Sequence, residues 1–260
     1  MIKRLFRVAL AGFLIYLLWP YNVLELKHHN PRTTALMELR KKEARAAHRK
    51  LKPELAWIRL GQISPNLVHA VFLAEDDTFY RHHGFDFEQI QIALAEDLQK
   101  QKYAYGGSTI TQQLARSLYL QPRKSILRKA KEAVLTVYLE LTLTKRRILE
   151  LYLNLVEWGP GIFGAQAASQ YYFRKPASEL TPDEAVALAS ILPSPRRWSP
   201  FSEKAFMARR RVQLMERMQR AGYAPLPEYI PAAGTVSNPF DPDVPPVPAD
   251  PPPPDAPANP

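Results

Sequence analysis

The residues best suited to chemistry lie in the segment AEDDTFYRHHGFD, from Ala74 to Asp86. Three carboxylates, two adjacent histidines and an aromatic pair follow an apolar run, Leu67 to Ala74. Glu75 ends this run, where its charge opposes the dipole of a helix that ends there. A carboxylate held against apolar side chains has a raised pKa, so Glu75 can serve as a general acid or base near neutral pH. The other interpretation of Glu75 is the solvated end of a helix.

Glu132 is a second carboxylate in apolar surroundings. On a helix it shares a face with apolar residues such as Leu139, so it needs a partner in order to remain charged. Arg128 and Lys129 lie one turn earlier and can supply that partner. These residues by themselves favour a structural ion pair. Glu75 and Glu132 on different helices across a cleft would instead form the pair of carboxylates expected for chemistry at the anomeric carbon of a sugar.

The segment GGSTITQQLAR, from Gly106 to Arg116, predicts a turn followed by a helix. At about 100° per residue the helix presents two stripes, one able to line a cleft and one able to pack in the core. The polar stripe consists of Thr109, Gln112, Gln113 and Arg116, and the apolar stripe of Ile110, Leu114 and Leu118. Thr109 with Gln112 also matches a capping box, which is a purely structural explanation for both.

Several common catalytic classes lack their signatures in this chain. His82 and His83 are adjacent, so they point in different directions, and no third ligand has suitable spacing for zinc. The sequence contains no Walker-type phosphate loop, no HExxH and no GxSxG. It also contains no cysteine, which excludes disulfides and thiolate chemistry.

The chain of 260 residues is basic, with a formal net charge of +10. The segment from Pro225 onward contains five acidic residues and no lysine or arginine, which leaves about +15 on the first 224 residues. Such a surplus suits a polyanionic partner, namely nucleic acid, anionic lipid headgroups or a phosphorylated substrate. A generally soluble basic surface is the plain alternative.

The residues from Leu5 to Leu24 are mostly apolar, over a length sufficient to cross a hydrocarbon core of about 30 Å. Basic residues precede this segment and an aromatic cluster ends it, as at the two borders of a membrane. A cleavable signal peptide would need small residues at a cleavage site, and the sequence WPYN from Trp19 to Asn22 offers none. The segment therefore predicts an uncleaved signal anchor.

Four parts of the chain follow from these patterns. Residues 1–26 are expected to be a cytoplasmic N-terminus and transmembrane anchor, 27–56 a basic juxtamembrane linker, 57–224 a mainly α domain, and 225–260 a proline-rich, largely disordered tail. Within the linker, Glu38 to Lys50 is interpreted as a solvated helix or spacer.

Eight helices are predicted in the domain from hydrophobic spacing and start signals. The stretch from Ala133 to Leu143 is apolar almost all round, as expected of a central buried helix. The predicted ranges are Pro65–Glu75, Asp86–Gln99, Thr109–Tyr119, Ile126–Leu143, Lys145–Val156, Gly164–Phe173, Pro182–Ile191 and Glu203–Ala221.

Three segments, in this order, resemble the motifs of glycosyltransferase family 51, the peptidoglycan glycosyltransferases. They are EDDTFYRHHG, GGSTITQQLAR and RKAKEAVLTVYLELTLTKRRILELYLN. The stretch from Trp158 to Pro195 continues the likeness, which covers about residues 64–200. The chain contains no S-x-x-K motif, so it is similar to members of the family without a transpeptidase domain.

The resemblance implies a mainly α, lysozyme-like glycosyltransferase domain with an N-terminal transmembrane helix. It implies polymerisation of lipid II into the β-1,4-linked glycan strands of peptidoglycan, with release of undecaprenyl diphosphate, on the outer, periplasmic face of the cytoplasmic (inner) membrane. The implied partners are lipid II, the growing glycan strand and the membrane. Cell-wall synthesis or division proteins are further candidates, and nucleic acid is not expected.

The resemblance also implies roles for individual residues. Glu75 matches the catalytic base, which takes the proton from the 4-hydroxyl of the acceptor sugar. Glu132 matches the glutamate that assists departure of the diphosphate, directly or through a divalent cation (Mg or Mn), and no organic cofactor is implied. The other matched positions bind the diphosphate or shape the cleft, and they are Asp76, Phe79, His82, Ser108, Thr109, Gln113, Arg116, Lys124 and Lys129.

This chain departs from the family pattern at two places. Arg116-Ser117 stands where Lys-Asn is usual, and Lys124 where Arg is usual. Arg116 keeps the charge and can bind phosphate oxygens with two hydrogen bonds, whereas Ser117 lacks the amide.

Two other functions fit parts of the pattern. A lysozyme-like hydrolase or lytic transglycosylase would share the fold and a catalytic glutamate, but it would not need the cationic cluster because no diphosphate leaves. A non-catalytic, membrane-anchored scaffold that binds lipid II would not need the two glutamates, Glu75 and Glu132, that are intact here.

Overall fold

The computed structural model describes residues 21–51, 55–100, 107–122 and 125–224, together with residues 4, 7 and 12. Most of the predicted anchor, Lys124 and the predicted tail lie outside the described residues. Among the residues that are described, none of the helices combines the length and the apolar composition needed to cross a bilayer.

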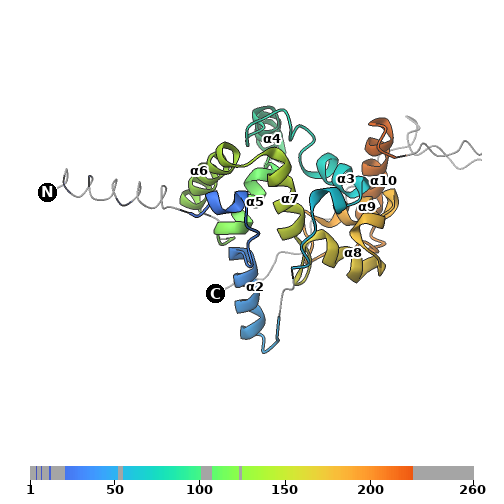
Figure 1. Ribbon diagram of the computed structural model, residues 1–260. Coiled ribbons are helices and arrows are strands. Elements are labelled where there is room, and N and C mark those ends of the chain that lie inside the picture. The colour runs from blue at the N-terminus through green and yellow to red at the C-terminus, as the bar shows by residue number, and fades with distance from the viewer. Residues whose placement is uncertain are drawn as a thin grey trace, which may run out of the picture. The chain divides into compact units, whose positions relative to one another are not determined.

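The described chain is mainly helical, as predicted (Figure 1). All eight predicted helices are confirmed, with ends that lie within two residues of the predicted ones. Several begin at a threonine whose side chain accepts a backbone N–H of the first turn, as at Thr109, Thr144 and Thr181. The helices are α3 (Pro65–Glu75), α4 (Phe87–Lys100), α5 (Ile110–Tyr119), α6 (Ile126–Thr142), α7 (Lys145–Leu155), α8 (Ala165–Phe173), α9 (Pro182–Ile191) and α10 (Ala205–Arg220).

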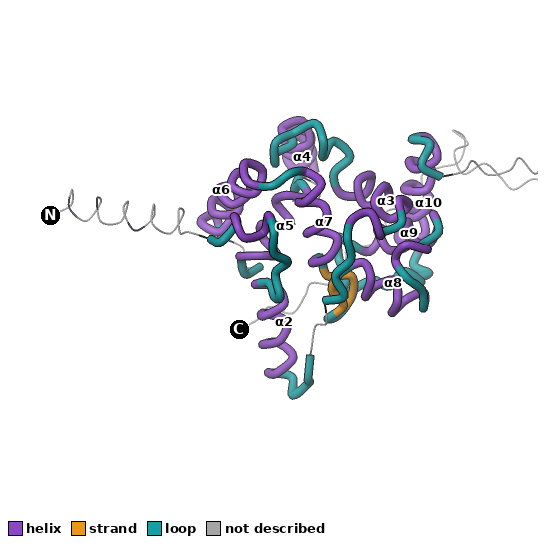
Figure 2. Tube along the Cα trace, viewed as in Figure 1, coloured by secondary structure: helices purple, strands orange, loops and turns teal. Residues whose placement is uncertain are grey.

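A few short elements complete the fold. Two strands, β1 (Glu157–Gly159) and β2 (Ile162–Phe163), form an antiparallel hairpin between α7 and α8 (Figure 2). The structure also contains three turns of 3₁₀-helix, namely η1 (Leu24–Lys27), η2 (Leu60–Gln62) and η3 (Ala177–Glu179). The hairpin was not predicted, because strands of three and two residues are too short to show an alternating pattern.

Helix α2 (Ala35–Ala46) corrects the interpretation of residues 38–50 as a solvated helix or spacer. The segment is helical, but it packs against α5 and buries Met37, which is 1% exposed. Its Arg40 donates to the buried Glu157 of β1 at 2.9 Å. The large apolar residues of α2, Leu36, Met37 and Leu39, form no regular stripe among its many charges, which is why the packing of α2 was not predicted.

The helix at the centre of the core is α7, not α6 as the sequence indicated. Most residues of α7 from Ile148 to Leu155 are buried, and the helix contacts α5, α6 and α8. Helix α6 packs one face against α5 and leaves the other exposed, with Leu141 81% accessible. Apolar residues on all sides of a helix can face either a protein core or another apolar medium. The sequence pattern alone therefore could not decide whether α6 is buried at the centre of the domain.

Helix α7 also holds two segments that precede it in the chain. The Arg147 guanidinium donates to the carbonyl of Leu26 at 2.8 Å and to the side-chain oxygen of Asn30 at 2.7 Å. One turn later, Glu150 accepts from the backbone N–H of Leu60 at 2.9 Å. These bonds attach residues 26–30 and the approach to α3 to the core. Helices α3, α9 and α10 pack on one another as a group.

Gly84, in the loop after α3, lies close against α6. Its φ is +91°, and a Cβ would lie 2.7 Å from Thr136 Cγ2 and 3.0 Å from Glu140 Cγ. We therefore expect Gly84→Ala to lower the free energy of unfolding by about 2 kcal/mol, through backbone strain and overpacking. Urea denaturation measures this effect. Gly61→Ala is the control, because its nearest neighbour is Arg146 Nη2 at 3.7 Å. Equal losses in the two variants would contradict the proposed close approach.

Candidate active site

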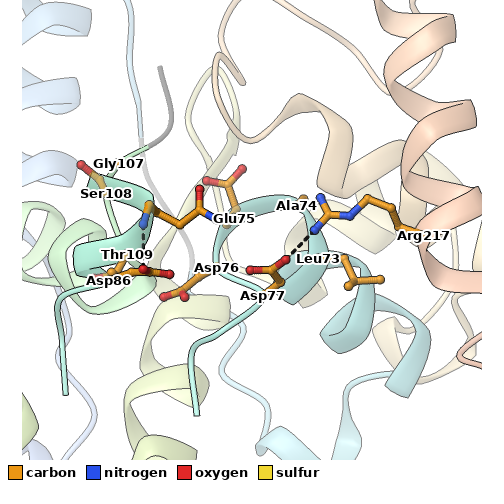
Figure 3. Close-up of a pocket in the computed structure, with 11 residues that line it drawn as sticks. Leu73, Ala74, Glu75, Asp76, Asp77, Asp86, Gly107, Ser108, Thr109 and Arg217 are labelled. Atoms are coloured by element: carbon orange, nitrogen blue, oxygen red, sulfur yellow. Dashed lines mark hydrogen bonds and ion pairs between the residues drawn. The ribbon is translucent and has the colours of Figure 1, made fainter. Parts of the chain in front are cut away.

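The Glu75 carboxylate lies at the last residue of α3, beside a pocket between that helix end and the loop before α5 (Figure 3). Its side chain is 10% exposed. Gln113 of α5 donates from Nε2 to Glu75 Oε2 at 2.8 Å. Arg210 of α10 approaches the other oxygen at 3.8 Å, which is too far for a hydrogen bond. Glu75 is therefore largely removed from water, with one neutral hydrogen-bond donor.

This environment makes Glu75 a weaker acid than usual. Burial raises the pKa of the Glu75 carboxyl above its ordinary value of 4.5, and it outweighs the hydrogen bond from Gln113 and the charges of Arg210 and Arg116, which lower it. Tyr152 of α7 donates from its hydroxyl to Gln113 Oε1 at 3.0 Å, so the amide presents its NH₂ group to the carboxylate. Burial also raises the pKa of Tyr152 well above its ordinary value, which keeps this hydroxyl a donor.

The pocket beside Glu75 is rich in acidic side chains. Asp77 on its rim pairs with Arg217 of α10 at 2.9 Å, as Figure 3 shows. The two arginines that α10 contributes, Arg210 and Arg217, are seven residues apart and so lie on one face of that helix. The pocket is lined by Leu73, Ala74, Glu75, Asp76, Asp77, Asp86, Gln89, Gly107, Ser108, Thr109 and Arg217.

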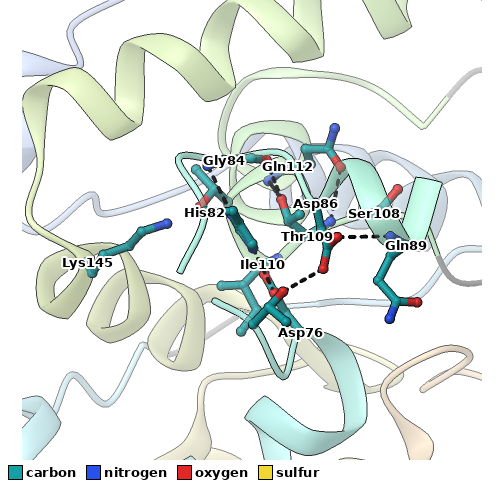
Figure 4. Close-up of polar contacts among 12 residues, drawn as sticks. Asp76, His82, Gly84, Asp86, Gln89, Ser108, Thr109, Ile110, Gln112 and Lys145 are labelled. Carbon is teal, nitrogen blue, oxygen red and sulfur yellow. Dashed lines mark hydrogen bonds and ion pairs between the residues drawn. The ribbon is translucent and has the colours of Figure 1, made fainter. Parts of the chain in front are cut away.

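Asp76 and His82 join the end of α3 to the start of α5 (Figure 4). Gly84 donates its N–H to His82 Nδ1 at 3.1 Å, so the other ring nitrogen, Nε2, carries the proton and donates to Asp76 Oδ1 at 2.9 Å. The second oxygen of Asp76 accepts from the N–H of Ile110, in the first turn of α5, at 2.9 Å. The network gives His82 a positioning role, for which the sequence offered no mechanism.

Three more of the predicted residues lie around this network. Phe79 is 1% exposed and has the Lys145 ammonium 4.4 Å from its ring centre. Thr109 caps α5, and its hydroxyl donates to the carbonyl of Gly84 at 2.7 Å. Ser108 lines the pocket, and its carbonyl accepts a long bond of 3.4 Å from Gln113.

The predicted stripes of α5 are only partly as expected. The apolar stripe is buried as predicted. In the polar stripe, Gln113 and Arg116 lie beside the two glutamates, whereas Gln112 is 3% exposed and completes the capping box with Thr109. Of the two explanations that the sequence left open for Gln112, the capping box is confirmed, because its amide oxygen accepts the N–H of Thr109.

Glu132 on α6 is in the opposite situation to Glu75. It is 0% exposed, but Lys129 contacts one carboxylate oxygen at 2.6 Å and Arg128 the other at 2.6 Å. Arg116 of α5 lies 3.9 Å from the second of these oxygens. Since Arg116 also acts on the charge of Glu75, it links the two acidic centres. The predicted partners of Glu132 are confirmed, and Arg116 joins them.

The described residues do not fit a divalent cation at Glu132. Both of its oxygens are occupied by cationic donors, which oppose rather than complete a metal site. Nowhere in the described part of the chain do three histidine, aspartate or glutamate side chains gather as metal ligands. The Mg or Mn ion stays a prediction, and no chemical step below depends on it.

Arg210 and Tyr152 are site residues that sequence reasoning did not identify. Arg210 lies in the run Arg209 to Arg211 of a helix that otherwise indicated only packing. Tyr152 lies among the apolar residues of α7, where its hydroxyl had no visible purpose. The run of arginines was a weak sign of a functional role for Arg210, and the sequence around Tyr152 gave no sign of one.

Comparison with known proteins is consistent with this geometry. The family model described as Transglycosylase matches residues 42–219. A biosynthetic peptidoglycan transglycosylase from Aromatoleum aromaticum is 47% identical over 225 residues, which cover 86% of this chain and 96% of that protein. Proteins with the same description from Laribacter hongkongensis and Thiobacillus denitrificans are 43% and 44% identical, over 80% of this chain and 92% and 90% of their own lengths.

The raised pKa of Glu75 predicts a pH-dependent effect on stability. Above the ordinary value of 4.5 the unfolded chain loses this proton more readily than the folded chain, so ionisation of Glu75 destabilises the fold as pH rises. Glu75→Gln has no such proton. Its unfolding temperature should match wild type at about pH 4 and exceed it at about pH 7, measured by circular dichroism in detergent. A difference that does not change with pH would contradict the assignment.

Proposed function

This chain belongs to the transglycosylase family, and we propose that it joins the disaccharides of lipid II into β-1,4-linked peptidoglycan strands and releases undecaprenyl diphosphate. It is a peptidoglycan glycosyltransferase, as the relatives named biosynthetic peptidoglycan transglycosylases support. The observation that carries the proposal is the desolvated Glu75, held by Gln113 within reach of a pocket and linked through Arg116 to a cationic group around Glu132.

In the reaction, Glu75 acts as the general base. Its carboxylate accepts the proton of the acceptor's 4-hydroxyl while that oxygen forms a bond to the anomeric carbon of the donor. The bond between this carbon and the diphosphate oxygen breaks on the opposite face, and the α-linked donor gives a β-linked product. A raised pKa makes the base stronger, and Gln113 keeps the accepting oxygen in place.

The cations around Glu132 stabilise the departing diphosphate. Lys129 is 50% exposed and Arg116 36% exposed, so both can reach a bound anion. Glu132 is fully buried and holds Arg128 and Lys129 in fixed positions. In this proposal its contribution is to preorganise positive charge where negative charge develops. Lys124, outside the described residues, is proposed to join this group.

The proposal places the enzyme at the periplasmic face of the cytoplasmic membrane, with residues 5–24 as its anchor. The exposed face of α6 supports membrane contact, because Ile126 is 88% and Leu141 81% accessible. Large apolar side chains exposed in one region favour an apolar surface as partner. On the same family likeness we assign the domain a lysozyme-like fold, and cell-wall synthesis or division proteins as candidate partners.

Glu75→Gln tests the proposed base. With purified protein, lipid II and Mg²⁺, the variant should polymerise glycan about 10²–10⁴-fold more slowly than wild type, because amide nitrogen and oxygen cannot accept the proton. Strand formation is followed on gels with labelled lipid II. The control is Glu179→Gln, because Glu179 is exposed and lies in η3, more than 100 residues after Glu75 in the sequence.

Two results would contradict the proposal. Undiminished polymerisation by Glu75→Gln would remove this residue from catalysis. Cleavage of finished peptidoglycan by the wild type, without polymerisation of lipid II, would indicate the hydrolase or lytic transglycosylase instead.

A further inference from the structure

Helix α3 has a second apolar face, which packs on the edge of the core and is only partly buried. Leu67, Ala70 and Val71 face the core and are each 0% exposed. A second stripe, at spacings of three and four residues, lines a groove on another side of the helix. Its members are Pro65, Val68, His69, Phe72 and Leu73. Apolar side chains that pack on the core and still line a groove with their exposed parts suggest a binding surface.

Aromatic and polar side chains from outside α3 also line this groove. Tyr80 is 59% exposed and Tyr223 41% exposed. Tyr223 stacks one face on the His69 ring, with 3.7 Å between the ring centres. Arg146 and Asp77 add hydrogen-bonding groups to the rim. The groove therefore combines broad apolar faces with a few polar groups, as sites for uncharged polar ligands do.

The groove is continuous with the pocket at Glu75. Leu73 and Asp77 line both, and Glu75 follows Leu73 by two residues at the same end of α3 (Figure 3). The stripe from Pro65 to Leu73 spans about 12 Å at the rise of an α-helix. A chain-like ligand that reacts at Glu75 could therefore extend from there along α3.

We propose that this groove binds the completed part of the glycan strand, beyond the sugars that react at Glu75. This inference rests on the proposed function, which makes the product a polymer. Sugar rings present apolar C–H faces to aromatic rings and hydroxyl edges to polar groups, which matches the mixed lining of the groove. A diphosphate would require a cluster of cations. This groove instead contains the carboxylate of Asp77, which already pairs with Arg217. The tyrosine hydroxyls and the rim of His69, Asp77 and Arg146 disfavour a polyprenyl chain.

The direct test is binding of an oligosaccharide of alternating N-acetylglucosamine and N-acetylmuramic acid that carries neither lipid nor diphosphate. It is titrated into the full chain in detergent, by calorimetry. Tyr80→Ala should weaken binding on the order of tenfold, and Tyr80→Phe, which keeps the ring, should stay within about twofold of wild type. Tyr171→Ala should bind as wild type, because Tyr171 is also 59% exposed but lies on α8 and lines neither cavity.

A second readout separates this inference from the proposed function. Tyr80→Ala should make shorter strands from lipid II than wild type and Tyr171→Ala do. Unchanged oligosaccharide affinity in Tyr80→Ala would overturn the inference. So would a polyprenyl phosphate that displaces the oligosaccharide from wild type but not from Tyr80→Ala, because Tyr80 would then contact the lipid. A wild type that binds the oligosaccharide but makes no polymer would overturn the proposed function instead.

Discussion

Burial of the Glu75 carboxylate, with Gln113 as its neutral donor among the described residues, is the interaction on which the candidate site depends. Three helices meet to produce it, because α3 ends at Glu75, α5 supplies Gln113 and α7 supplies the Tyr152 hydroxyl that orients the Gln113 amide. Asp76 then ties the end of α3 to the first turn of α5. A displacement of any of these helices would admit water to Glu75, which lowers its strength as a base, or remove the donor that holds its accepting oxygen in place.

In the proposed reaction the two glutamates take different roles because their environments differ. Among the described residues the closest cation to Glu75 is Arg210, at 3.8 Å, so the carboxylate can still accept a proton. Glu132 has two cations at 2.6 Å, so its charge is neutralised and its use is to hold them. Carboxyl groups placed in such contrasting surroundings take different roles in one reaction. Arg116 interacts with the charges of both glutamates, so the proposed base and the proposed leaving-group site are electrostatically linked.

Local patterns in the sequence were sufficient for the helices and for part of the site. Capping threonines and periodic apolar residues predicted α3 to α10, and the partners of Glu132 were predicted because Arg128 and Lys129 are one turn away on the same helix. Arg210 is 135 residues from Glu75 in the chain, and no local pattern can report such a contact. The proton position on His82 likewise depends on Gly84 and Asp76, which only the folded loop brings together.

The most direct test of the central claim is titration of Glu75 itself. In protein with ¹³C-labelled glutamate carboxyls, the Glu75 resonance is identified by its absence from the Glu75→Gln spectrum and followed across pH. The account predicts a midpoint above the ordinary value of 4.5, because burial outweighs the favourable contacts of the ionised form. A midpoint at or below 4.5 would show that Glu75 is stabilised as an anion, and would contradict its role as a strengthened base.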